Sequence, residues 1–257
     1  MANDLEAIIR RDRGIVLASL VAVTGLAWAY LAVIAADMGG ASIDGMAVAR
    51  IKPWTAVDFA AMLVMWAVMM VGMMAPSATP MILLYAAVTR KQRAQGHALA
   101  PTGAFVAGYV VAWSAFSLAA TGLQWALAGA ALLSPMLVSA SPYVTGLLLV
   151  GAGVYQWTPL KHACLENCRS PVAFLSRSWR RGVGGALRMG VHHGAYCVGC
   201  CWVLMGLLFV GGVMNLLWVA AIAAFVLIEK LAPFGHATAR FAGAVLVLGG
   251  AAVIVQG

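Results

Sequence analysis

The decapeptide HHGAYCVGCC, residues 192–201, concentrates the metal-ligating side chains of this chain. It holds two of the five histidines and three of the five cysteines, and it continues directly into an apolar run. On a helix, the three cysteines would lie at about 40°, 340° and 80° from the second histidine, so four side chains share one face. Imidazole and thiolate ligands suit Cu(I) or Zn(II). The predicted metal ligands here are His193, Cys197, Cys200 and Cys201, while His192 points elsewhere.

A stripe of methionines upstream forms a second candidate cluster. At 100° per residue, Met62, Met69 and Met73 fall within about 40° of one another, and Met65 flanks them. Thioethers are soft neutral ligands that hold Cu(I). Methionine is also a flexible apolar side chain that fills helix interfaces, and packing is the more common explanation of such a stripe taken alone.

The segment TPLKHACLENCRSP, residues 158–171, carries a third cluster. Its candidate ligands are His162, Cys164, Glu166 and Cys168. The two cysteines would face the same way on a helix because they are four residues apart. We expect Lys161 and Arg169 to favour the thiolates electrostatically. The spacing lacks the second cysteine pair of a zinc finger, and a plain solvated loop remains an equal alternative.

The elements that position these residues are predicted to be transmembrane helices. The composition is 63% hydrophobic and only 9% charged, which excludes a water-soluble globular domain. About 20 apolar residues span the roughly 30 Å of a bilayer core, and the continuous apolar runs indicate helices rather than a β-barrel. We therefore predict an all-α polytopic transmembrane bundle as a single domain. Its seven predicted spans are 14–36, 55–89, 102–133, 143–160, 185–210, 213–228 and 237–256.

Charge predicts the orientation of the bundle. With the N-terminus inside, all lysines and arginines except Arg50 and Lys52 fall on the cytoplasmic side, and the C-terminus lies outside. The net charge of +8 is thus explained by topology and not by nucleic-acid binding. The second and third runs are over-long, which predicts tilt, extension beyond the bilayer, or a break at Pro76 and Pro80.

Two further features concern packing and charge inside the bundle. Glycines at five positions are expected to let neighbouring helices pack closely. These are Gly146, Gly151, Gly153, Gly190 and Gly194. Glu229 and Lys230 end an apolar run, and such a pair more often marks the end of a helix at the interface than a buried functional site.

Several motifs together resemble a known bacterial family. They are Trp66, Met69, Met70, Met73, Met74, Ala75 and Pro76 with Pro80; YQWTPLKHACLENCRSP; Cys197, Gly199, Cys200, Cys201 and Trp202; Gly212 to Asn215; and Glu229 with Lys230. In these residues the chain is similar to the predicted metal-binding integral membrane proteins, a family with a domain of unknown function. The resemblance covers residues 54–235 and implies metal binding and a multi-pass location in a bacterial inner membrane.

The order of the clusters leads to a functional hypothesis. Thioethers would lie in the outer half of the membrane, His193 and its cysteines near the middle, and the third cluster at the cytoplasmic rim. This order suggests a relay that binds Cu(I) and transports it or delivers it to a partner, without enzymatic activity. The partners would be the lipid bilayer, the metal ion and a copper-donating or copper-accepting protein, with zinc as a possible alternative ion.

Two other functions remain open. A thiol–disulfide oxidoreductase could use Cys164, Cys168 and the cysteines of the decapeptide, because Cys197 and Cys200 form a C-x2-C pair. An oxidoreductase of this kind would not need the methionine stripe. A haem-binding subunit could use His192 or His193 as an axial ligand, but no second span carries a histidine near its middle.

Overall fold

The computed structural model describes residues 2–39, 54–94, 101–130 and 141–256, and within these ranges the chain forms helices and turns without a β-strand. The predicted all-α class is therefore confirmed. The helices are α1 (Ala2–Gly39), α3 (Ala56–Ala94), α4 (Thr102–Gly129), α5 (Pro142–Tyr155), α6 (Pro159–Arg169), α7 (Pro171–Ser178), α8 (Gly182–Gly206), α9 (Leu208–Gly211), α10 (Leu216–Leu231) and α11 (Gly235–Gln256).

Among the described residues, five stretches are long and apolar enough to cross a membrane. They are Arg13–Asp37, Ala56–Arg90, Thr102–Gly129, Gly182–Gly211 and Gly235–Gln256. They correspond to the first, second, third, fifth and seventh predicted spans. Residues 131–133 of the third predicted span, and Arg50 and Lys52, lie outside the described residues.

The fourth and sixth predicted spans differ from the helices that the chain forms. The predicted span 143–160 is wrong as a single helix, because α5 ends at Tyr155 and α6 begins at Pro159, with the Thr158 side chain capping its first turn. With 14 residues, α5 is about 21 Å long. The sixth predicted span, 213–228, corresponds to α10. This helix begins at Leu216 because the side chain of Asn215 caps its first turn. Its 16 residues measure about 24 Å, less than the roughly 30 Å of a bilayer core.

Helix α3 runs without a break through Pro76 and Pro80 and extends to Ala94. The structure therefore excludes an interruption at the prolines, and tilt and extension beyond the bilayer stay as the two predicted explanations for its length. Ser77 donates a hydrogen bond to the carbonyl of Met74 at 2.9 Å, and Thr79 donates one to that of Ala75 at 3.1 Å. These hydroxyl bonds are local to the segment between the two prolines and reach the carbonyls three or four residues earlier on the same helix.

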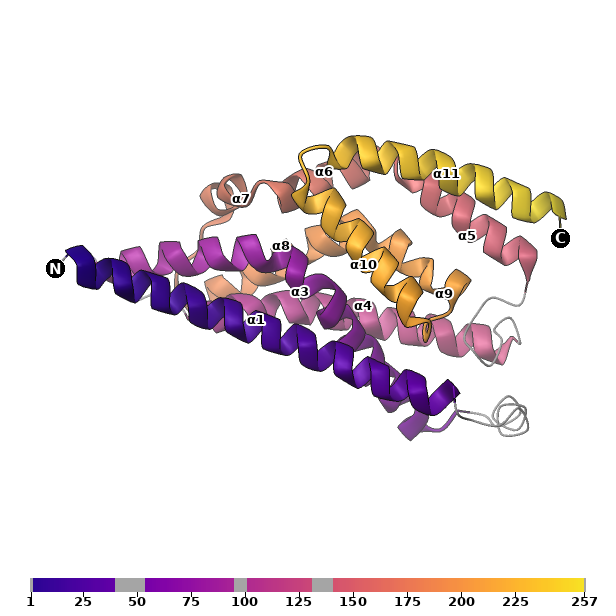
Figure 1. Cartoon of the computed structure of the whole chain (residues 1–257), viewed down its shortest axis with the longest axis horizontal. Coiled ribbons are helices and arrows are strands. Elements are labelled where there is room, and N and C mark those ends of the chain that lie inside the picture. The colour runs from indigo at the N-terminus through magenta and orange to yellow at the C-terminus, as the bar shows by residue number, and fades with distance from the viewer. Residues whose placement is uncertain (1, 40–53, 95–100, 131–140, 257) are drawn as a thin grey trace.

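The helices pack in pairs. Helix α1 lies along α3, α4 against α8, and α5 against α11, the last pair lying side by side at the upper right of Figure 1. A Cβ atom on Gly194 would lie 2.6 Å from the Cβ of Ala112, and one on Gly153 would lie 2.6 Å from the Gly243 carbonyl. Close packing at these glycines is thus confirmed, whereas Gly151 has open space around it and the expectation for it was wrong.

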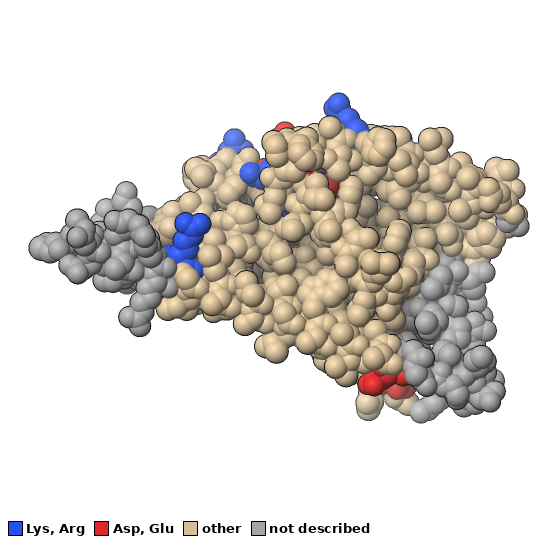
Figure 2. All heavy atoms as spheres, in the orientation of Figure 1, with Lys and Arg blue, Asp and Glu red and all other residues tan. Residues whose placement is uncertain are grey.

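The outer surface is largely apolar. Figure 2 shows a broad area without charged side chains, between basic groups toward its upper left and an acidic group at its lower edge. Large aliphatic side chains on α1, α10 and α11, such as Leu26, Leu217 and Leu248, are exposed on the isolated chain. Apolar exposure of this extent is compatible with association with a membrane.

Candidate metal centre

Four thiols from two helices meet inside the bundle. Cys197, Cys200 and Cys201 of α8 are buried, in agreement with the helical face drawn from their spacing. The Cys168 side chain of α6 lies near those of Cys197 and Cys200, which raise its pKa. The clusters expected in the middle of the membrane and at the rim therefore form one group, which we call the thiol centre: Cys168, Cys197, Cys200 and Cys201. All five cysteines of the chain are free.

Cys164 lies at the edge of the thiol centre, where α6 packs against α8. Its sulfur is so close to Gly199 that a Cβ atom there would lie 2.8 Å from it. The hydroxyl of Tyr155 donates a hydrogen bond to the Gly199 carbonyl, which ties the end of α5 to the same turn of α8. Burial and the neighbouring Cys200 raise the pKa of the Cys164 thiol, and hydrogen bonds with Cys197 and Cys200 hold that of Cys168 well above its ordinary value.

Replacing Gly199 with alanine tests this contact. The added methyl group would displace the Cys164 sulfur from its packed position against α8, so we expect a loss of about 1–3 kcal/mol in the free energy of unfolding. The measurement is the thermal unfolding midpoint of the purified protein. Gly151→Ala is the matched control, because nothing lies within 4 Å of the added atom. Equal midpoints for the two variants would contradict the close contact.

A buried lysine completes the thiol centre. The ammonium of Lys230 on α10 donates hydrogen bonds to the sulfur of Cys197 at 2.8 Å and to the hydroxyl of Ser77 at 3.3 Å. The Tyr109 hydroxyl lies 3.0 Å from the same sulfur. Lys230 lies in the last turn of α10, as expected, but it is 5% exposed and therefore buried. The sequence feature that indicates a buried, functional lysine here is an ionisable residue at the end of an apolar run.

Lys161 and Arg169, the two cations expected to favour the thiolates, form their contacts with other groups. Lys161 is buried and forms a salt bridge with Glu229 at 2.7 Å, and it also donates to Gln156. Arg169 donates to the backbone carbonyls of Glu229 at 2.5 Å and Ala232 at 2.7 Å. These contacts fix α6 to the end of α10, and they bring Cys168 and Lys230 to the same place.

His193 lies beside the thiol centre with an unused nitrogen. Its ring is buried against the rings of Phe105, Tyr109 and Phe174. Its Nδ1 atom is buried and has no hydrogen-bond partner among the described residues. A buried nitrogen without a partner is costly, and a metal ion would satisfy it. His192 is exposed and contacts Tyr196, as its different angle on the helix predicts.

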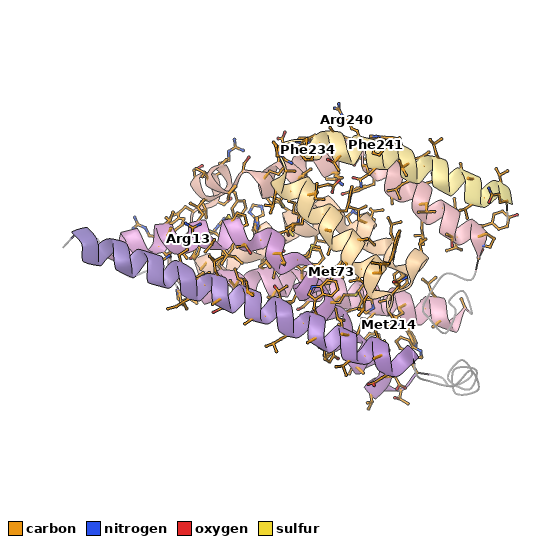
Figure 3. All side chains as sticks on the ribbon, viewed as in Figure 1. Arg13, Met73, Met214, Phe234, Arg240 and Phe241 are labelled. Atoms are coloured by element: carbon orange, nitrogen blue, oxygen red, sulfur yellow. The ribbon has the colours of Figure 1, made fainter. Side chains whose placement is uncertain are left out.

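Methionines of α3 reach the thiol centre through a residue outside the predicted stripe. The sulfur of Met74 lies 4.0 Å from that of Cys201. Met65, Met69 and Met73 are buried in the core, with Met73 in the middle of the bundle in Figure 3. The partly buried Met62 accepts a hydrogen bond from the Gln124 amide at 3.5 Å.

His162 lies apart from the thiols. Its ring pairs with that of His236 on α11, whereas Cys164 and Cys168 face α8. Residues two apart on a helix point about 200° apart, which explains the separation of His162 from Cys164.

The described residues contain no group of three His, Cys, Asp or Glu side chains spaced to hold a metal ion as they stand. At the thiol centre, the Lys230 ammonium lies against Cys197 where a cation would bind. Metal binding therefore requires that this ammonium move aside and the thiols draw together.

Comparison with known proteins adds an independent result. A family model described as PpoB2, copper chaperone, matches residues 63–253, which include the whole thiol centre, Met74, His193 and Lys230. Neither a curated protein nor a solved structure matches the chain. The family match supports a copper-related function. Because it covers most of the sequence, this chain belongs to the PpoB2 copper chaperone family.

Proposed function

We propose that this chain is an integral membrane protein that binds Cu(I) at the thiol centre and passes it to a partner protein. The observation that carries the proposal is the convergence of four thiols from α6 and α8 around Lys230, with the Met74 sulfur 4.0 Å from that of Cys201. Membership of a copper chaperone family supports the choice of metal. Thiolate and thioether ligands select Cu(I) among common ions.

The charges around the site also favour Cu(I). Two thiols that bind Cu(I) release two protons to solvent, and the resulting complex of two thiolates and Cu(I) has a net charge of −1. The Lys230 ammonium would neutralise this complex inside a medium that penalises isolated charge. The same two thiolates with Zn(II) would already be neutral, and the buried ammonium would then lack a counter-ion.

The methionines of α3 would form the path between the thiol centre and one membrane surface. Met74 adjoins Cys201, and Met73, Met69, Met65 and Met62 follow along the same helix. Neutral thioethers bind Cu(I) more weakly than thiolates, so an ion can move between them by ligand exchange. His193, with its free Nδ1, would serve as an additional ligand at the inner end of this path.

In the membrane we propose seven crossings, with the N-terminus in the cytoplasm and the C-terminus outside. Five helices have sufficient length, and the shorter α5 and α10 would cross a locally thinner region. A reporter enzyme that is active only outside the cytoplasm should be active when fused after the last residue. The same reporter should be inactive before the first residue. The opposite pattern would overturn this orientation.

The test of copper binding is the Cu(I) content of the purified protein in the presence of a competing Cu(I) chelator. We expect about one ion per chain, and a loss to background in the variant with Cys197, Cys200 and Cys201 all replaced by serine. Met81→Leu is the control, since it changes a buried methionine two turns beyond Met74. Metal-free wild-type protein that contains a reducible disulfide would overturn the proposal and support the oxidoreductase alternative.

A further inference from the structure

Two histidines meet outside the thiol centre, at the junction of α6 and α11. The Nδ1 atoms of His162 and His236 lie 3.2 Å apart, and the ring centroids are separated by 5.3 Å. Both side chains are partly exposed, so solvent and ions can reach them. His236 opens α11 just after the turn that Arg169 holds, and sequence spacing gave no sign of the pairing because 74 residues separate the two histidines.

The spacing of the two nitrogens matches that of ligands on one metal ion. With metal–nitrogen bonds of about 2.0–2.1 Å, a separation of 3.2 Å corresponds to an angle of roughly 100° at the metal. Such an angle fits tetrahedral or octahedral coordination. A linear two-coordinate Cu(I) ion would instead need nitrogens about 4 Å apart.

The surroundings offer a third ligand. Burial lowers the pKa of His162, and the nearby His236, Arg240 and Lys161 lower it further. Glu166 lies one turn after His162 on α6 and its carboxylate acts on the same ring. Glu166 is exposed, and residues four apart share a helix face, so a change of rotamer brings its carboxylate toward the two rings. Figure 3 shows Arg240 projecting outward from the same part of α11.

We infer that His162, His236 and Glu166 form a second metal site, which binds a borderline divalent cation and is distinct from the thiol centre. Two imidazoles and one carboxylate leave open positions on the ion for water or for a side chain of another protein. When the ion binds through both Nδ1 atoms, the proton shared in the contact between them moves through solvent to the Nε2 atom of the ring that donates it.

Cobalt(II) is the probe for this site, applied to the full-length protein in detergent. Cobalt bound by nitrogen and oxygen ligands absorbs weakly in the visible range, whereas cobalt bound by thiolates also has an intense near-ultraviolet band. We expect the visible band alone, with an affinity at least about tenfold lower in His162→Ala and His236→Ala and a smaller decrease in Glu166→Gln. His236→Gln provides a second variant that keeps a polar partner for His162 and preserves the fold.

The exposed His192 supplies the matched control, and His192→Ala should bind cobalt as the wild-type protein does. Unchanged affinity in both His162→Ala and His236→Gln would overturn the inference, as would a spectrum containing only thiolate bands. This experiment is independent of copper binding. Cobalt bound without Cu(I) at the thiol centre would contradict only the proposed function, and Cu(I) bound without the cobalt band would contradict only the second site.

Discussion

Replacing Lys230 with methionine is expected to weaken Cu(I) binding by about two orders of magnitude. The variant removes the buried ammonium that would neutralise a complex of two thiolates and Cu(I), and an uncompensated buried charge costs about 3 kcal/mol or more. A cost of that size corresponds to roughly a hundredfold in the dissociation constant. Titration of the purified protein against a chelator of known Cu(I) affinity measures the change.

Two controls separate charge from packing at this position. Lys230→Arg keeps the positive charge and should retain most of the affinity. Leu231→Met changes the exposed neighbour on α10 and should have no effect. Equal Cu(I) affinities of Lys230→Met and the wild-type protein would show that the ammonium is not the counter-ion of the complex.

The second large effect concerns the buried salt bridge between Lys161 and Glu229. Replacing Glu229 with glutamine leaves Lys161 fully buried opposite a neutral amide, and we expect a loss of about 3–5 kcal/mol in the free energy of unfolding. The double variant Lys161→Met with Glu229→Gln removes both charges and should recover part of this loss. Denaturant unfolding of the purified proteins provides the comparison.

Glu166→Gln is the matched control for this salt bridge, because it neutralises an exposed glutamate on α6. Its stability should stay within about 0.5 kcal/mol of the wild-type value. The salt bridge also bears on the thiol centre, since it joins α6 to the residue before Lys230. If Glu229→Gln were as stable as Glu166→Gln, the attachment of α6 would depend on other contacts.

Much of the fold follows from local properties of the chain. The five long helices of the described residues coincide with apolar runs, since a helix satisfies the backbone hydrogen bonds of such a run within the run itself. The prediction was wrong between residues 156 and 158, where Thr158 and Pro159 supply a cap and a first helical residue. These signals were present in the sequence, but the apolar character of the flanking residues concealed them.

By itself, the sequence determined which side chains share a helix face. Cys197, Cys200 and Cys201 point into the bundle together because their spacing matches the turn of one helix. Only the tertiary structure decided which partners meet that face. Cys168 joins the thiols, Lys230 turns inward to Cys197, and His162 pairs with His236, through contacts between helices. Such contacts depend on where whole helices dock, and that position is set by close packing and buried charge pairs distributed over the chain.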